Sequence, residues 1–318
     1  MDYVRTPEHR FDQLPGFDFE PQYLALSSGL RMHYIDEGSR DGEAVLLLHG
    51  QPTWSYLYRT MVPPLSAKGL RVIAPDLVGF GRSDKPTLRS SHTVRNHIGW
   101  LGELLHALDL QRVTLVAQDW GGPIGLGALV AAPDRFSRIV AANTTMHTAA
   151  PSLKDRLGWA CHDTGDGRVS VAAALLDYQR MTQELPELAP SLFVQGATAR
   201  DISTHELVAY DVPFPDESFC AGPRQLPLMM GLTPSSECAR RNTKTLASLG
   251  AFSGSLLTAY SDGDPSTRGW DDILYGACPS ARFRQRITLE GAGHFLQEDV
   301  GPAFADAIAH FVEATPSV

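Results

Sequence analysis

Short apolar runs alternate with longer amphipathic stretches through the first half of the chain. Residues 44–48 are continuously apolar, which is typical of a strand covered on both faces. Residues 31–35 alternate between apolar and polar and predict a strand with one solvated face. Other buried strands are predicted at 71–74, 112–117 and 138–142. Helical spacing at about 94–108 and 122–131 completes an alternation that predicts a mostly parallel sheet flanked by helices.

This pattern changes after about residue 146. Residues 147–225 show no buried strand, and their helical pieces, such as 171–182 and 203–210, are cut by Pro186, Pro190, Pro213 and Pro215. Strand-like runs return at 255–260 and 286–289, and a last helix is expected at about 302–313. We therefore predict an α/β core domain formed by residues 1–146 and 226–318, interrupted by a helical cap domain of residues 147–225.

Composition and charge narrow the classes of partner. The 318 residues carry a formal net charge of −9 and contain no dense run of Lys and Arg, which argues against nucleic acid and anionic membranes as partners. No stretch approaches the roughly 20 apolar residues that a membrane span needs. The N-terminal 21 residues lack the apolar segment of a signal peptide. We expect a cytoplasmic protein.

The cysteines do not indicate a metal site. Cys161, Cys220, Cys238 and Cys278 are widely spaced, with no CxxC motif and no Cys/His cluster of the zinc type. A chain of this length needs no disulfides, so free thiols are the simpler interpretation.

The strongest chemical signal is the run VAQDWGG at residues 116–122. A predicted buried strand passes into a predicted helix across one sharp turn, with Ala117 and Gly121 placed two residues on either side of Asp119. That spacing is typical of a nucleophile elbow, in which a strained turn lifts one side chain out of the sheet. An isolated Asp before a helix would more often be a cap, but the small residues around it favour the nucleophile.

Two further loops fit the same arrangement. His49-Gly50-Gln51-Pro52 follows a predicted strand, and in such folds this loop supplies one backbone N–H of an oxyanion hole, while Trp120 supplies the other. His294 lies in the glycine-rich run GAGHF near the C-terminus, so the chain order nucleophile, acid, histidine is possible. Either Asp262 or Asp264 could orient the imidazole; we favour Asp264 because it stands directly before a proline.

These motifs resemble those of the haloalkane dehalogenases. The resemblance rests on HGQPTWSYLYR at 49–59, PDLVGFGRSDKP at 75–86, QDWGG at 118–122 and GHFLQE at 293–298. It extends over nearly the whole chain, is weakest at residues 147–200, and is strongest to the subfamily with two halide-binding tryptophans. It implies an α/β-hydrolase fold with an inserted helical cap.

The resemblance also implies a two-step reaction on small halogenated aliphatic compounds. The Asp119 carboxylate would displace the halide, and water activated by His294 and Asp264 would then hydrolyse the resulting ester. The N–H groups of Gln51 and Trp120 would hold the tetrahedral intermediate. The products are an alcohol, a halide ion and a proton, and no metal or organic cofactor is required. Whether the chain is a monomer or a small homo-oligomer stays open.

The halide site needs hydrogen-bond donors in an apolar pocket. The Trp120 indole is the first candidate that the resemblance implies. Trp159 is the only Trp between residues 121 and 269 and is favoured as the second donor because the family uses an indole. Tyr178 occupies the register expected for that Trp, and its hydroxyl is the alternative donor.

Two other functions are compatible with parts of the sequence. An epoxide hydrolase shares the fold and the Asp nucleophile, and Tyr178 and Tyr210 could serve as its two cap acids. Gln118 and Trp120 favour the dehalogenase instead. A hydrolase-fold protein that binds a small ligand without turnover is the second alternative, but such a protein would have no need for Asp119, His294 and Asp264 together.

Overall fold

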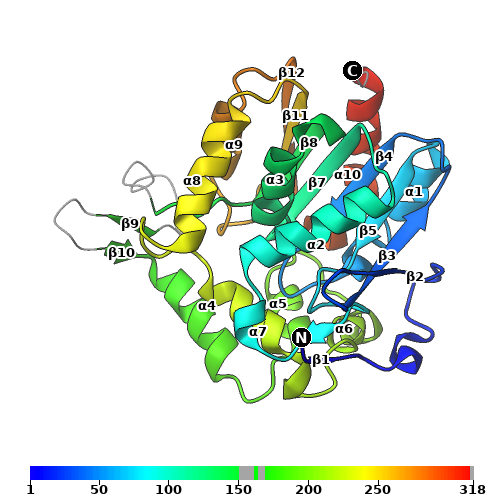
Figure 1. Cartoon of the computed structure of the whole chain (residues 1–318), viewed down its shortest axis with the longest axis vertical. Helices are drawn as coiled ribbons and strands as arrows, with labels where there is room; N and C mark the ends of the chain where they lie inside the picture. Colours follow the sequence, from blue (N-terminus) through cyan, green and yellow to red (C-terminus); the bar gives the residue numbers. More distant parts are fainter. Residues whose placement is uncertain (150–160, 164–168, 316–318) are drawn as a thin grey trace.

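The central feature of the protein is an eight-stranded sheet, seen in a computed structural model that describes residues 1–149, 161–163 and 169–315 (Figure 1). The spatial order of the strands is β12-β11-β8-β7-β4-β5-β3-β2. Along the chain, the bounds are β2 (Gln22–Ala25), β3 (Arg31–Glu37), β4 (Ala44–Leu48), β5 (Arg71–Pro75), β7 (Val113–Asp119), β8 (Phe136–Thr144), β11 (Ser255–Ser261) and β12 (Phe283–Leu289).

The six strands from β12 to β5 run parallel, and β3 and β2 are added antiparallel at one edge. Side chains on the central strands, such as Leu46, Val116 and Val140, are fully buried. This burial explains the continuous apolar runs, because a parallel sheet has helices over both faces. The predicted α/β-hydrolase fold is confirmed, including every strand expected from the sequence.

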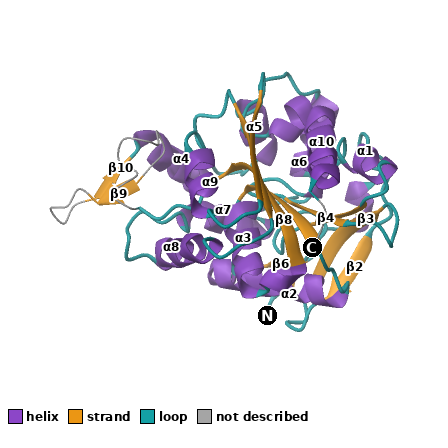
Figure 2. Cartoon of the chain, turned by 90° about the horizontal axis from the view of Figure 1, so that it is seen from above, coloured by secondary structure: helices purple, strands orange, loops and turns teal. Residues whose placement is uncertain are grey.

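Helices cover both faces of the sheet, as the view from above shows (Figure 2). Helices α1 (Val62–Ala67) and α10 (Leu296–Ala314) pack against each other on one face. On the other face, contacts run in sequence through α2 (Val94–Ala107), α3 (Gly121–Ala131), α8 (Glu237–Leu249) and α9 (Trp270–Ala277). No helix within the described ranges is long and apolar enough to cross a membrane.

Among its described residues, the segment between β8 and α8 contains four α-helices, which are α4 (Ala173–Glu184), α5 (Pro190–Gly196), α6 (Thr204–Asp211) and α7 (Ala221–Leu228). It also contains a short antiparallel pair, β9 (Cys161–Asp163) and β10 (Val169–Val171), which the sequence did not predict. Three-residue strands are too short to show a period. Pro190 begins α5 instead of ending a helix, because the first helical residue needs no N–H donor. The division into a core domain and a cap domain stays a prediction.

Three buried histidines, His92, His97 and His147, have ring nitrogens with no hydrogen-bond partner among the described residues. The rings of His92 and His97 lie 5.8 Å apart, and within the described part of the chain neither nitrogen of His97 has a partner. Burial lowers the pKa of His92 to about 4 and that of His97 well below its usual value. Burial also lowers the pKa of His147 to about 4, although Asp119 partly opposes the effect. These side chains are therefore neutral in the folded protein at pH 6.

These histidines should make the folded state less stable in mild acid. Below pH 6.5 the unfolded chain binds protons that the folded chain does not bind, because the pKa values of His92 and His147 are about 4 and that of His97 is well below its usual value. Stability therefore falls as the pH falls. Each histidine contributes about 1.4 kcal/mol per pH unit within this window. Urea denaturation at pH 6.5, 6.0 and 5.5 measures the slope, because above pH 6.5 the raised pKa of His294 acts in the opposite direction. His97→Phe should reduce the slope, and the exposed-site control His310→Gln should not; equal slopes in all three proteins would contradict the assignment.

Candidate active site

The site is organised around the turn that joins β7 to α3. Asp119 is the last residue of β7, and its φ of +50° places it in the left-handed region, which is unfavourable for a residue with a side chain. Helix α3 takes Trp120 as its N-cap, so Asp119 does not have the capping role. Thr144 Oγ1 donates to the Asp119 carbonyl at 2.6 Å and ties the turn to the neighbouring strand.

Two glycines make this turn possible. A Cβ atom on Gly121 would lie 2.1 Å from the Leu48 carbonyl oxygen, and one on Gly122 would lie 1.8 Å from Thr144 Oγ1. Both distances are far below van der Waals contact, and both positions require glycine. The spacing of small residues noted in the sequence therefore follows from the approach of α3 to the ends of β4 and β8.

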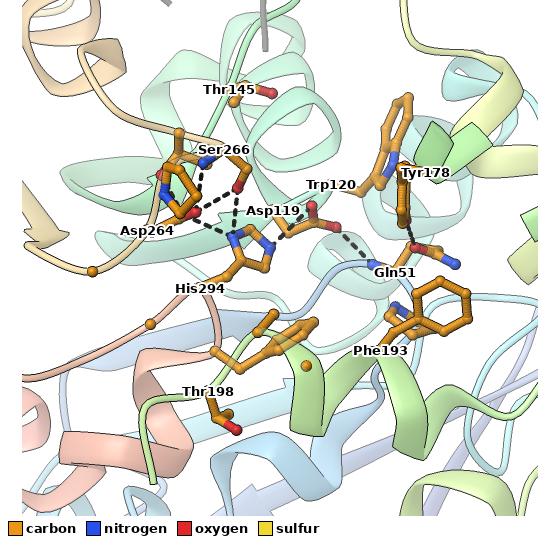
Figure 3. Close-up of a pocket in the computed structure, with 18 of the residues that line it drawn as sticks. Gln51, Asp119, Trp120, Thr145, Tyr178, Phe193, Thr198, Asp264, Ser266 and His294 are labelled. Carbon is orange, nitrogen blue, oxygen red and sulfur yellow. Dashed lines mark hydrogen bonds and ion pairs between the residues drawn. The ribbon is translucent and has the colours of Figure 1, made fainter. Parts of the chain in front are cut away.

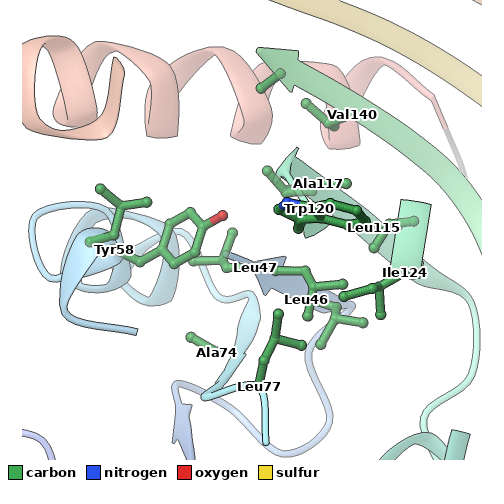
Figure 4. Close-up of a cluster of buried hydrophobic side chains, with 14 of the residues drawn as sticks. Leu46, Leu47, Tyr58, Ala74, Leu77, Leu115, Ala117, Trp120, Ile124 and Val140 are labelled. Atoms are coloured by element: carbon green, nitrogen blue, oxygen red, sulfur yellow. The ribbon is translucent and has the colours of Figure 1, made fainter. Parts of the chain in front are cut away.

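A buried hydrophobic cluster supports the turn from below. Trp120 packs among side chains of β4, β7 and α3, which include Leu46, Leu47, Leu115 and Ile124 (Figure 4). All of these side chains are at most 4% exposed. Because such interiors are close-packed and stiff, the cluster restricts movement of the Asp119 backbone.

The loop after β4 passes directly over the Asp119 carboxylate. The Gln51 backbone N–H donates to Asp119 Oδ1 at 2.7 Å. A Cβ atom on Gly50 would lie 2.1 Å from the same oxygen, so the close approach requires glycine there. The predicted oxyanion loop therefore has a donor on the carboxylate, although whether this donor acts in catalysis stays a prediction.

The buried carboxylate of Asp76 holds this loop in place through hydrogen bonds. It is fully buried and accepts from the Ser55 N–H at 2.8 Å and from the His33 ring at 2.7 Å. Burial by itself raises the pKa of Asp76, but the two neighbouring histidine rings and the hydrogen bonds outweigh it and hold the pKa at about 2. The Asp76 carboxylate is ionised at neutral pH.

His294 lies between two carboxylates (Figure 3). Its Nδ1 is 2.8 Å from Asp264 Oδ2, and its Nε2 is 3.5 Å from Asp119 Oδ2. Asp262 faces elsewhere, where its Oδ1 accepts from the Gly291 N–H at 2.9 Å. The geometry thus brings Asp264 to the imidazole and leaves Asp262 to shape the loop that carries it.

The charges around His294 favour its protonated form while both carboxylates are ionised. Burial lowers the pKa of His294, but Asp264 and Asp119 outweigh it and raise the pKa to about 10. Burial alone would raise the pKa of Asp264, yet His294 and two hydroxyl donors hold it well below its usual value. Asp264 is therefore a fixed negative charge against the imidazole.

Three residues that the sequence interpretation overlooked complete this arrangement. The Ser266 N–H and hydroxyl donate to Asp264 Oδ1 at 2.8 and 2.5 Å, and the Thr267 hydroxyl donates to Oδ2 at 2.5 Å. The available signal was the Asp-Pro-Ser-Thr order, which is typical of a turn closed by the Asp side chain. Asn143, with a φ of +36°, donates from Nδ2 to the carbonyls of Gly293 and His294 at 2.9 and 3.1 Å.

A cavity of about 430 Å³ opens onto Asp119, and its wall opposite His294 includes Gln51, Trp120, Tyr178 and Phe193. Its size suits a small organic ligand. In Figure 3, Trp120 and Tyr178 are both drawn on the side of Asp119 away from Asp264, and both line the cavity. No group of three metal-type ligands occurs in the part of the chain that the structure describes.

Three residues of the predicted cap are candidates for the second halide donor or for the epoxide acids: Tyr178, Tyr210 and Trp159. The Tyr178 hydroxyl donates to Gln51 Oε1, and burial followed by the nearby Asp119 raises the pKa of this phenol well above its usual value. Tyr210 is fully buried, donates to the Glu298 carboxylate and does not line the cavity. Trp159 lies outside the described residues.

Comparison with known proteins agrees with this geometry. A family model described as the alpha/beta hydrolase fold matches residues 43–299. A haloalkane dehalogenase from Psychrobacter cryohalolentis is 41% identical over 99% of this chain and 100% of its own length. One from Mycobacterium marinum is 38% identical over 97% of this chain and 99% of its own.

A solved structure is similar over the same extent. The tetrameric structure of haloalkane dehalogenase DpaA from Paraglaciecola agarilytica NO2 has a TM-score of 0.85 and 33% sequence identity, and the match covers 98% of this chain and 99% of that one. The full-length similarity includes the loops that carry Asp119, Asp264 and His294. The chain therefore belongs to the haloalkane dehalogenase family of α/β hydrolases, which hydrolyse carbon–halogen bonds.

Proposed function

We propose that Asp119, His294 and Asp264 are the catalytic residues through which this dehalogenase converts a haloalkane to an alcohol, a halide ion and a proton. The observation that carries the proposal is the alignment of the three side chains, with His294 Nδ1 2.8 Å from Asp264 and Nε2 3.5 Å from Asp119. The Gln51 N–H on the other oxygen of Asp119 supports it. A protein that only binds a small ligand would have no use for this alignment.

In the first step, Asp119 Oδ2 attacks the carbon that bears the halogen. A carbon–oxygen bond forms, the carbon–halogen bond breaks, and the halide leaves with the bonding electrons. A carboxylate is ionised at neutral pH, so this step needs no base. The Gln51 N–H on Oδ1 orients the carboxylate and leaves Oδ2 facing the cavity.

In the second step, water hydrolyses the ester on Asp119. His294 Nε2 takes a proton from the water, whose oxygen attacks Cγ of Asp119. Negative charge then develops on Oδ1, where the Gln51 N–H already donates, and the Trp120 N–H is assigned as the second donor by its place after the nucleophile. The tetrahedral intermediate then collapses: the bond between Asp119 Cγ and the alkoxy oxygen breaks, and that oxygen takes the proton from the His294 imidazolium to give the alcohol. The second proton of the attacking water is released, which restores the Asp119 carboxylate. Asp264 stabilises the imidazolium that forms.

The departing halide requires donors in an otherwise apolar wall. We assign the Trp120 indole and the Tyr178 hydroxyl, because both line the cavity, and the Tyr178 hydroxyl would turn its proton from Gln51 Oε1 to the halide. The raised pKa of Tyr178 keeps the phenol protonated, and hence a donor, at neutral pH. Trp159 is the alternative second donor on the ground of residue type.

The epoxide hydrolase alternative lacks one of its two acids. It requires two cap tyrosines in the cavity, and among the described residues only Tyr178 is there. The Tyr210 hydroxyl instead donates its hydrogen bond to the Glu298 carboxylate. The indole of Trp120 favours a halide over an epoxide oxygen.

We also propose a cytoplasmic location, which the free, buried thiols of Cys220, Cys238 and Cys278 support. A small homo-oligomer is proposed because the similar DpaA is tetrameric.

The two-step reaction predicts that His294→Gln stops after the first step. Glutamine cannot take the proton from water, so the alkyl ester accumulates on Asp119. Mass spectrometry of this variant mixed with 1,2-dibromoethane should show a covalent adduct, located in the peptide that contains Asp119. Asp119→Ala should form no adduct and should lose turnover by at least about 10⁴-fold. An unmodified His294→Gln protein, under conditions where the wild type turns over, would contradict the proposed roles.

The halide site predicts that Tyr178→Phe weakens bromide binding by about tenfold, the usual effect of losing a hydrogen bond to a charged group. Quenching of tryptophan fluorescence by bromide measures the dissociation constant. Tyr56→Phe is the control, because the Tyr56 hydroxyl is bonded to the Pro15 carbonyl outside the cavity. If Trp159→Phe weakens bromide binding and Tyr178→Phe does not, the second donor is Trp159.

A further inference from the structure

Gln118 is buried directly beside the imidazole of His294. It stands one residue before Asp119 on β7 and is 0% exposed. Its Nε2 lies 3.2 Å from His294 Nε2 and 3.2 Å from the His294 carbonyl oxygen. Its Oε1 is buried and has no hydrogen-bond partner among the described residues. A buried amide with one unused end is unfavourable, and its orientation therefore requires an explanation.

The His294 carbonyl explains the orientation. A backbone carbonyl oxygen can only accept, so the amide nitrogen of Gln118 must be the end that faces it. Rotating the amide by 180° would place Oε1 against that carbonyl oxygen and would remove the hydrogen bond. The same carbonyl accepts from Asn143 Nδ2 at 3.1 Å, which holds it in place. The donor end of Gln118 is thus directed at His294 by the backbone itself.

An N–H donor beside Nε2 distinguishes the two protonation states of His294. Neutral imidazole with its proton on Nδ1 presents a lone pair at Nε2, which accepts from Gln118 until the hydrolytic water takes that place, while Gln118 keeps its hydrogen bond to the His294 carbonyl. Imidazolium presents an N–H there, so two donors would face each other. We propose that Gln118 is a positioning residue of the ester-hydrolysis step, which favours His294 as a free base with its proton on Nδ1 toward Asp264. The inference rests on the proposed role of His294 as general base.

The charged groups around His294 act in the opposite direction. Asp119 and Asp264 both favour imidazolium. Asp262 and Asp299 accept from backbone N–H groups of the same loop and add negative charge behind it. Elsewhere in the cavity lining, burial keeps Tyr178 and His147 neutral at pH 7. When Asp119 is esterified, it loses its negative charge and no longer favours imidazolium. In the ester-hydrolysis step, where His294 must be a free base, fewer negative charges therefore oppose the effect of the Gln118 N–H.

The test compares Gln118→Met with the wild type in single turnovers of 1,2-dibromoethane. Methionine fills a similar volume without donating a hydrogen bond. Rapid quenching and mass spectrometry give the rate constants for ester formation and ester hydrolysis between pH 6 and 10. We expect ester formation within about threefold of the wild type. We expect the pH midpoint of hydrolysis to rise by about 1 unit, which slows hydrolysis about tenfold below the midpoint.

Gln179→Met is the matched control. Gln179 is also a buried glutamine that donates to one backbone carbonyl, that of Pro227 at 2.8 Å, and it does not line the cavity. The pH midpoint of ester hydrolysis in Gln179→Met should equal that of the wild type.

If Gln118→Met does not fold, Gln118→Glu is used instead, because glutamate has the same size and places a hydrogen-bond acceptor beside His294 Nε2. The hydrolysis midpoint of Gln118→Glu should also rise, and the alkyl ester should accumulate at pH 7.

An unchanged midpoint in folded Gln118→Met, or equal slowing of both steps at every pH, would overturn the inference. Either result leaves the proposed triad intact, provided that His294→Gln accumulates the ester. If His294→Gln forms no ester, the triad itself is wrong. The two failures are therefore distinguishable.

Discussion

The left-handed turn at Asp119 is the constraint on which the active site depends. A residue with a Cβ atom adopts this conformation at a cost of about 1–2 kcal/mol, so the surrounding structure must hold it there. Packing of Trp120 into the hydrophobic cluster and the hydrogen bond from Thr144 to the Asp119 carbonyl do so. The turn lifts the carboxylate above the sheet, where the Gln51 N–H and His294 can reach it. This turn also requires glycine at three positions, because a Cβ atom on Gly50, Gly121 or Gly122 would collide with a neighbouring atom.

Electrostatics gives the site two states. With Asp119 ionised, His294 lies between two carboxylates and its pKa is raised to about 10. Once Asp119 carries an alkyl group, one of these charges is gone, and the imidazole becomes easier to deprotonate just when a base is needed. Asp264 is held ionised by Ser266 and Thr267, so it orients the ring in both states without competing for the proton. In the proposed reaction, the same three side chains would therefore support nucleophilic attack first and general-base catalysis second.

Much of the core could be predicted because buried parallel strands leave a clear signal. Residues 44–48, for example, are apolar throughout because both faces of β4 are covered. The elbow was also predictable, since close backbone approach forces small residues at fixed positions. The acid could not be fixed from the sequence, because Asp262 and Asp264 stand two residues apart in the same turn and only the fold separates their partners.

The predicted cap was the least predictable part, because its helices are short and mixed in polarity, and the β9-β10 pair has no periodic pattern. For the second halide donor, we propose Tyr178 because it lines the cavity, whereas residue type favoured Trp159.

The central claim is that the oxygen of the product alcohol comes from Asp119 in the first turnover. A single turnover of the wild type in H₂¹⁸O, with enzyme in excess over 1,2-dibromoethane, measures this directly by mass spectrometry of the alcohol and of the peptide that contains Asp119. The proposed reaction predicts unlabelled alcohol and one ¹⁸O atom in the Asp119 carboxylate. Labelled alcohol with an unlabelled Asp119 peptide would mean that water attacks the haloalkane directly, and would contradict the account.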